Sequence, residues 1–128
     1  MKKRKFKIEY QLKTASVHIL WNSISTPLGL SEWFADGVTV NDNNEYTFTW
    51  DHNDQTAFFV ESKQNDFIRF RWEEDEGKDY FFEMKIEKLQ VTGELALIVT
   101  DFTTPDDKED LILLWNKSIE VLRRKTGI

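Results

Sequence analysis

The 128-residue sequence predicts an α+β fold in which a curved antiparallel sheet packs against one long C-terminal helix, in the order β-α-α-β(6)-α. Three observations lead to this prediction. The chain opens with a strand-like alternation, its middle consists of alternating segments joined by short polar connections, and its end has the caps and apolar spacing of a long helix. One face of such a sheet needs apolar cover, which the helix supplies. We therefore expect a single domain over residues 1–128.

The first predicted element is a half-buried strand. Its pattern has a period of two, with apolar side chains at Phe6, Ile8, Tyr10 and Leu12. The polar residues between them form a solvent face, and this face accounts for the lysines near the start of the chain.

Two short helices are expected next. Thr14 is the predicted N-cap of the first, whose apolar side chains recur at helical spacing at Val17, Leu20, Trp21 and Ile24. Thr26 is predicted to cap the second helix and Pro27 to open it, because a proline loses no hydrogen bond at the first helical position. Asp36-Gly37 then ends the helical region.

Residues 38–102 predict a meander of six strands. Short connections rich in Asn, Asp and Gly separate the strands, so that neighbours in sequence are antiparallel neighbours in the sheet. Alternation places one set of side chains on the inner face, toward the long helix: Tyr46, Phe48, Trp50, Ile68, Phe70, Trp72, Tyr80, Phe82 and Met84. The cluster Asp51-His52-Asn53-Asp54 is typical of a turn, with a weak cation site as the alternative interpretation.

The long helix is predicted from Thr104 to about Lys125. Thr104 is its expected cap, Pro105 its first residue, and Asp107 the partner in a capping box. Acidic residues near its start and basic residues near its end complement the helix dipole. Its apolar face consists of Ile112, Trp115, Ile119 and Leu122, widened by Leu111, Leu114 and Ser118.

Composition narrows the function classes. Seventeen Lys and Arg against 23 Asp and Glu give a net charge of −6, which argues against nucleic acid as a partner. The chain has no cysteine, which excludes disulfides and thiolate metal sites. No segment approaches the ~20 apolar residues of a membrane span. No apolar run follows the basic start, so we expect a cytoplasmic protein.

One stretch of sequence resembles a known family. The segment LWNSISTPLGLSEWFADGVTV, followed by YTFTW, is similar to the START-related helix-grip superfamily (SRPBCC). It resembles in particular the branch that includes activators of the large heat-shock chaperone's ATPase. The resemblance rests on Trp21, on the turn Thr26-Pro27-Leu28-Gly29-Leu30, and on Trp33-Phe34. It implies a helix-grip fold that holds an apolar ligand between sheet and helix, or that serves as a chaperone-binding or regulatory module.

The many inward rings favour a non-enzymatic binding module for a small apolar or amphipathic molecule. The expected ligand-binding residues are Trp21, Trp33, Phe48, Trp50, Phe70, Trp72, Phe82, Met84, Trp115 and Ile119. The alternative is a protein-interaction or chaperone-regulating module with a filled core. A cyclase- or hydrolase-like enzyme is disfavoured because His18 and His52 stand alone, so no catalytic residue, metal or cofactor is expected.

Two arginines leave an alternative open. Arg69 and Arg71 share one face of a strand, and Glu83 and Glu87 share the corresponding face of the next. They form a cross-strand charge lattice if this face is toward solvent. If it faces the helix instead, two arginines would suit an anionic head group.

Overall fold

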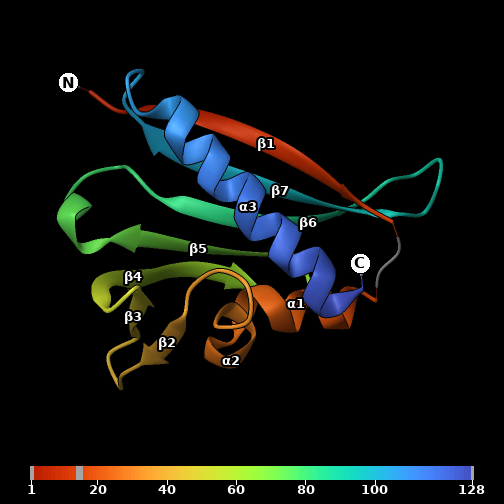
Figure 1. Cartoon of the computed structure of the whole chain (residues 1–128), viewed down its shortest axis with the longest axis horizontal. Helices are drawn as coiled ribbons and strands as arrows, with labels where there is room; N and C mark the ends of the chain where they lie inside the picture. Colours follow the sequence, from red (N-terminus) through yellow and green to blue (C-terminus); the bar gives the residue numbers. More distant parts are fainter. Residues whose placement is uncertain (1, 14–15, 128) are drawn as a thin grey trace.

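The computed structural model describes residues 2–13 and 16–127 and contains one seven-stranded antiparallel sheet crossed by a long helix (Figure 1). The strands are β1 (Arg4–Leu12), β2 (Gly37–Val40), β3 (Glu45–Trp50), β4 (Asn53–Lys63), β5 (Phe67–Trp72), β6 (Phe82–Lys88) and β7 (Leu95–Thr103). Their order in the sheet is β1-β7-β6-β5-β4-β3-β2. The predicted β-α-α-β(6)-α helix-grip architecture is confirmed.

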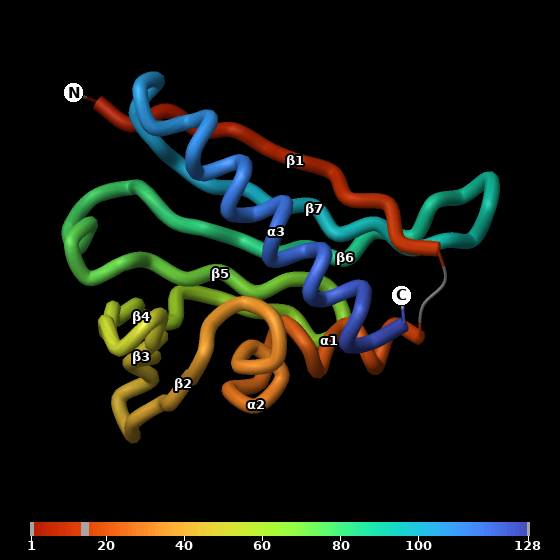
Figure 2. Tube along the Cα trace, in the orientation of Figure 1, coloured from red at the N-terminus to blue at the C-terminus, as the bar shows by residue number. Residues whose placement is uncertain are grey.

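The helices are α1 (Val17–Ser25), α2 (Pro27–Leu30) and α3 (Lys108–Thr126), with a 3-10 turn η1 (Glu73–Asp75) after β5. Helix α3 runs diagonally over one face of the sheet, and its C-terminal end lies beside α1 (Figure 2). The two short helices therefore close one end of the space between the sheet and α3. None of the helices in the described ranges has the length and apolar character needed to cross a bilayer.

Two helix starts differ from the predicted ones. Helix α1 is capped by Ser16, whose Oγ accepts from the Ile19 amide at 3.4 Å, and the expected cap Thr14 lies outside the described residues. The prediction that α3 starts at Thr104 is wrong, because the helix begins at Lys108. Thr104 Oγ1 donates to Asp107 Oδ2 at 3.1 Å rather than accepting from a backbone amide, so residues 104–107 form a turn before the helix.

The start of α2 agrees with the prediction. Thr26 Oγ1 accepts from the Gly29 amide at 2.9 Å, and Pro27 is the first helical residue. A Cβ at Gly29 would clash with the carbonyl oxygen of Asn22, so glycine is required where α1 and α2 approach each other. The Thr-Pro-Leu-Gly-Leu segment thus fixes the corner between the two helices.

The connection between β3 and β4 is a two-residue hairpin. Asp51 and His52 have φ of 48° and 68°, the left-handed values that a type I′ turn needs and that favour Asn and Asp. Asp54 Oδ1 accepts from Thr49 Oγ1 at 2.6 Å across the start of the hairpin. The polar cluster at residues 51–54 therefore forms the turn of this hairpin.

The two faces of the sheet carry different chemistry. Phe48, Phe70, Phe82 and Met84 are fully buried on the inner face, where they pack in one core with Trp115, Ile119 and Leu122 of α3. On the outer face, Arg69 Nη2 donates to Glu83 Oε1 at 2.7 Å, and the Arg71 Nε donates to the Tyr80 carbonyl at 2.9 Å. Arg69 and Arg71 therefore lie on the outer, solvent side of the sheet and not on the side that faces α3.

The prediction that Tyr80 faces inward is wrong. Strand β6 begins only at Phe82, so the alternation of the strand does not extend back to Tyr80. Its ring packs beside Phe102 at a centroid distance of 5.4 Å, and its hydroxyl accepts from the Lys3 amide at 3.3 Å. Tyr80 therefore lies on the outer side of the sheet.

Candidate functional site

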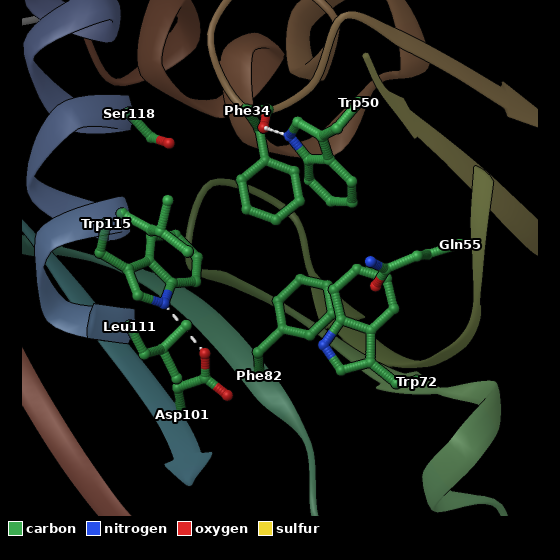
Figure 3. Close-up of a pocket in the computed structure, with 10 residues that line it drawn as sticks. Phe34, Trp50, Gln55, Trp72, Phe82, Asp101, Leu111, Trp115 and Ser118 are labelled. Carbon is green, nitrogen blue, oxygen red and sulfur yellow. Dashed lines mark hydrogen bonds between the residues drawn. The ribbon is translucent and has the colours of Figure 1, made fainter. Parts of the chain in front are cut away.

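A cavity of about 480 Å³ lies between the inner face of the sheet and α3 (Figure 3). We call it the pocket; it is lined by Phe34, Trp50, Gln55, Trp72, Phe82, Asp101, Leu111, Leu114, Trp115 and Ser118. Strands β3 to β7 supply one side and α3 the other. The loop after α2 contributes Phe34 at the end that the short helices close.

Aromatic rings form most of the pocket wall. The Phe34 ring lies at the centre, with centroid distances of 5.3 Å to Trp115, 5.5 Å to Trp50 and 5.7 Å to Phe82. Trp50 Nε1 donates to the Phe34 carbonyl oxygen at 2.8 Å, which ties the loop to β3. Trp72 stacks on Phe82 at 4.8 Å on the side away from α3. These contacts hold the rings in place without a ligand.

Trp33, the neighbour of Phe34, has a different role. Its Nε1 donates to the Ser23 carbonyl oxygen at 2.8 Å, and the ring is buried against α1. Trp33 therefore anchors the loop to the short helices, whereas Phe34 points toward the sheet and lines the pocket.

Asp101 places a carboxyl group in this apolar wall. It lies on β7, and its side chain is only 7% exposed. Its Oδ2 accepts from Trp115 Nε1 at 2.9 Å, and its Oδ1 accepts from the Phe102 amide at 2.7 Å. The first of these bonds joins the sheet to α3 across the pocket wall (Figure 3).

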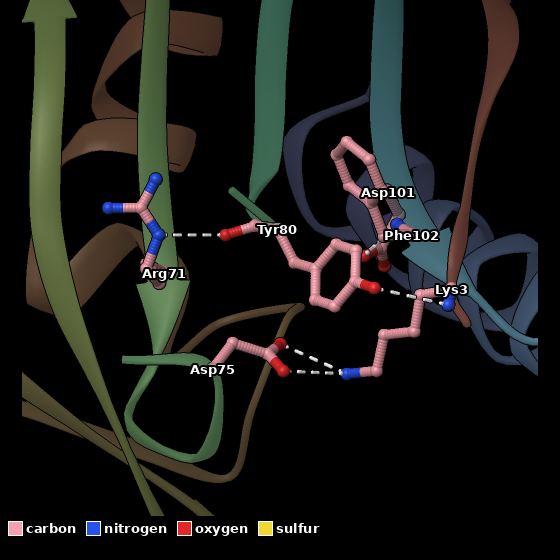
Figure 4. Close-up of polar contacts among 6 residues, drawn as sticks. All are labelled: Lys3, Arg71, Asp75, Tyr80, Asp101 and Phe102. Carbon is pink, nitrogen blue, oxygen red and sulfur yellow. Dashed lines mark hydrogen bonds and ion pairs between the residues drawn. The ribbon is translucent and has the colours of Figure 1, made fainter. Parts of the chain in front are cut away.

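Burial raises the pKa of Asp101 from its usual 3.8 to about 6, against the opposing effects of the hydrogen bonds from Trp115 and Phe102 and of the charge on Lys3. The nearby carboxylate of Asp75 raises the pKa further, as the smallest of these effects. Lys3 Nζ contacts both carboxylate oxygens of Asp75 at 3.0 Å (Figure 4). Its raised pKa brings the titration of Asp101 closer to neutral pH than that of an exposed aspartate, and the other nine lining residues are not titratable in this range.

Two other polar side chains line the pocket. Gln55 on β4 is paired with Phe48 of β3 in the sheet register, and Ser118 lies one turn beyond Leu114 on α3. Gln55 offers both donors and an acceptor, and Ser118 offers a hydroxyl. Together with Asp101 they give an otherwise apolar pocket three polar contacts for orienting a molecule.

The structure separates the ten predicted ligand-binding residues into two groups. Trp50, Trp72, Phe82 and Trp115 line the pocket. The other six lie in the core or against it: Trp21, Trp33, Phe48, Phe70, Met84 and Ile119. Whether any of them contacts a ligand stays a prediction. His18 and His52 are exposed, and neither lines the pocket.

Sequence reasoning placed Ser118 on the apolar face of the long helix but missed the other two polar groups of this site, Asp101 and Gln55. Asp101 follows Leu95, Leu97 and Val99 at a spacing of two, which by itself indicates an inward side chain. This signal is weak in the sequence because residues on both faces of β7 are apolar or buried over much of its length. No alternation between polar and apolar residues is therefore visible in this strand. Gln55 follows a turn and gave no signal of its position.

Comparisons with known proteins agree with the fold. A family model described as a START-like superfamily domain matches residues 1–128. Protein BfR322 from Bacteroides fragilis is similar, with 41% identity, a TM-score of 0.67, and coverage of 98% of this chain and 92% of that one. A comparison with curated proteins gives no match.

Two more distant solved structures share the fold. The Aha1 dimer from Colwellia psychrerythraea has 13% identity and a TM-score of 0.74, with 100% of this chain and 98% of that chain covered. Protein BH1534 from Bacillus halodurans has 13% identity and a TM-score of 0.76, with 98% and 99% covered.

Proposed function

Since the chain belongs to the START-like superfamily, we propose that it is a binding module that holds a small apolar or amphipathic molecule in the pocket between its sheet and α3. The observation that carries this proposal is the cavity of about 480 Å³. Pockets of roughly 300–1,000 Å³ with apolar walls and a few convergent polar groups are typical small-molecule sites.

The chemistry of the lining supports this assignment. Five aromatic rings and two leucines offer apolar contact, and the hydrogen bonds of Trp50 and Trp115 hold two of the rings in fixed positions. A preformed wall costs a ligand little ordering free energy. Asp101, Gln55 and Ser118 would orient a polar end of the molecule.

The alternative is a protein-interaction module, as the START-related resemblance also implies. Four apolar side chains favour it, because they are largely exposed on the helices: Ile19, Leu28, Leu113 and Leu114. That alternative requires a filled core, however, and the cavity beside α3 counts against it. We therefore place ligand binding first.

Enzymatic activity ranks below both. Asp101 is a candidate acid or base, yet the pocket lining of the described residues offers it no histidine, lysine or second carboxylate as a partner. A nucleophile with an adjacent base is likewise missing from these ten residues. We propose no turnover.

Two adjacent leucines of α3 provide a matched test. Leu114 lines the pocket and is 61% exposed, whereas Leu113 is 56% exposed and does not line it. Native mass spectrometry of protein purified from cells should show a copurified small molecule, or binding from a panel of fatty acids, flavonoids and isoprenoids. Leu114→Trp should fill the mouth of the pocket and reduce binding, and Leu113→Trp should not.

The proposal fails if no compound binds with saturation, or if the two tryptophan variants weaken binding equally. The interaction module would be favoured if no compound binds with saturation and a captured protein partner is released by Leu113→Trp and Leu114→Trp. Circular dichroism melts of both variants check that each remains folded.

A further inference from the structure

We propose that the pocket selects an organic cation: a protonated amine on an apolar body, whose ammonium group pairs with the carboxylate of Asp101. This inference rests on the proposed function and names the class of ligand for the same pocket.

The first step is that Asp101 is a buried carboxylate that forms no ion pair with any of the described residues. Aspartates are rarely this buried unless they are paired, and Asp101 is 7% exposed. In the described part of the chain, the basic side chains that form ion pairs are Lys3, Lys63, Arg69 and Lys85, and all of them pair with other carboxylates. The two donors that Asp101 does have, an indole and a backbone amide, are neutral.

The second step concerns Lys3, the basic residue whose charge acts on Asp101. Both of its contacts at 3.0 Å go to the oxygens of Asp75, and its backbone amide donates to the Tyr80 hydroxyl (Figure 4). Lys3 lines a surface depression with Tyr80 and Phe102 and is not part of the pocket lining. Among the described residues, no basic side chain lines the pocket, so a cation that compensates Asp101 from the pocket side would be supplied by the ligand.

The third step is that Asp101 retains acceptor capacity. An ionised carboxylate has about four lone-pair positions, and each oxygen of Asp101 accepts one hydrogen bond. The remaining positions suit the N–H groups of an ammonium, and a charge-assisted bond of this kind is roughly twice as strong as a neutral one.

The fourth step is the aromatic surroundings. Trp115, whose indole touches Asp101, lies 5.3 Å from Phe34 and 6.4 Å from Phe82 between ring centroids. Tryptophan and phenylalanine faces attract cations within about 6 Å, and the attraction is larger where water is excluded. A carboxylate set among such rings is chemically suited to an amine, whereas it repels a ligand carboxylate.

The test compares three probes that share one body: naphthylethylamine, naphthylethanol and naphthylacetate. Each is titrated at neutral pH into ¹⁵N-labelled protein, and the indole N–H signals of Trp72 and Trp115 report binding in the pocket. The amine should bind about tenfold more tightly than the alcohol, as expected when a neutral hydrogen bond becomes a charge-assisted one. The acid should bind more weakly than the alcohol.

Two variants separate a specific contact from the attraction of an acidic protein for any amine. Asp101→Asn removes the charge in the pocket with little change in shape. Asp42→Asn removes one charge from the exposed turn between β2 and β3, outside the pocket lining. Asp101→Asn should reduce the preference for the amine to about twofold or less, whereas Asp42→Asn should leave it unchanged.

Each other outcome has a defined meaning. If the alcohol or the acid binds at least as tightly as the amine, or if Asp101→Asn keeps the preference, the cation inference is overturned and the binding function stands. The same holds if none of the three probes binds but a compound of the broader panel does. If neither the probes nor the panel bind, both proposals fall.

Discussion

Two buried aspartates at the same end of the sheet have opposite surroundings. Asp75, in η1, is 4% exposed and forms a two-oxygen ion pair with Lys3. Asp101, on β7, is 7% exposed, and the donors that it has among the described residues are neutral. A buried ion pair is compensated within the fold, whereas a buried charge without a counter-ion costs stability. The comparison shows that the charge of Asp75 is compensated by Lys3, whereas the charge of Asp101 is available for the ligand contact proposed above.

The largest effect is expected from removing the indole that supports Asp101. Trp115→Ala should lower the free energy of unfolding by about 3–5 kcal/mol, the usual cost of truncating a buried aromatic residue. Urea unfolding measures this change in the free energy of unfolding. Trp115→Phe is the control, because it keeps an aromatic ring while it removes the Nε1 donor together with part of the indole, so its loss should be smaller than that of the alanine variant. A loss below about 1 kcal/mol in the alanine variant would mean that the ring contributes little to the core.

The next prediction concerns the charge of Asp101 itself. Its folded pKa of about 6 lies above the usual 3.8, so the native state binds the proton more tightly than the unfolded state. The stability from this group is complete below pH 3.8 and is lost as the pH rises through about 6. Asp101→Asn removes this charge, although its amide nitrogen cannot accept one of the two hydrogen bonds that Asp101 accepts. The stability of the variant relative to wild type should therefore rise between pH 4 and pH 8 by up to about 3 kcal/mol.

Urea melts of wild type and Asp101→Asn at pH 4 and pH 8 check this sign. The stability of the variant minus that of wild type should be more favourable at pH 8 than at pH 4. A variant that is destabilised equally at both values would show that Asp101 is a structural residue like Asp75, and the comparison between them would no longer hold.

Breaking the ion pair of Asp75 should have a smaller effect. Lys3→Met leaves the carboxylate of Asp75 buried without its partner, and we expect a loss of about 1–2 kcal/mol. The value is below that of a fully buried pair because the Lys3 side chain is 27% exposed and is partly screened by water. Denaturant melts in low and high salt measure this change in the free energy of unfolding. If neither condition shows a loss, the structural role of Asp75 is contradicted.

The smallest effect is expected on the outer face. Arg69 contacts Glu83 at 2.7 Å and lies 4.3 Å from the ring centroid of Phe81. Arg69→Met should cost about 0.5–1 kcal/mol, because the pair is partly exposed and the remaining stem still covers the ring. Thermal melts with Glu83→Gln as the second arm of a double-mutant cycle measure the pair itself. A loss as large as that of Trp115→Ala would contradict the distinction between the two faces.

The sequence predicts the architecture well because its signals are local. Period-two alternation identifies the inner face at Phe48, Phe70 and Phe82, and the Thr26-Pro27 pair identifies the start of α2. The errors also come from local rules. A capping pattern placed the start of α3 at Thr104, and alternation was extended past the end of β6 to Tyr80.

The candidate site is less predictable because it depends on contacts between distant segments. Which inward rings fill the core and which leave a cavity is decided by the loop that carries Phe34, held by a bond from Trp50 sixteen residues later. Asp101 is recognisable as a buried carboxyl only once β7 lies between β1 and β6 and beneath α3. Spacing along the chain indicates at most the face of β7 on which Asp101 lies, and it gives neither the position of the Phe34 loop nor the cover by α3.

The pairing of β1 with β7 has a consequence for synthesis of the protein. Arg4 to Leu12 pair with Leu95 to Thr103, so the first strand has no neighbour in the sheet until most of the chain has left the ribosome. Pairings this distant in sequence form slowly, and the nascent first strand is protected meanwhile by its alternating lysines, which oppose pairing with other chains. Asp101 and Trp115 lie in β7 and α3, the last two elements in the order of this fold. The pocket between them is therefore completed only after α3 has been synthesised.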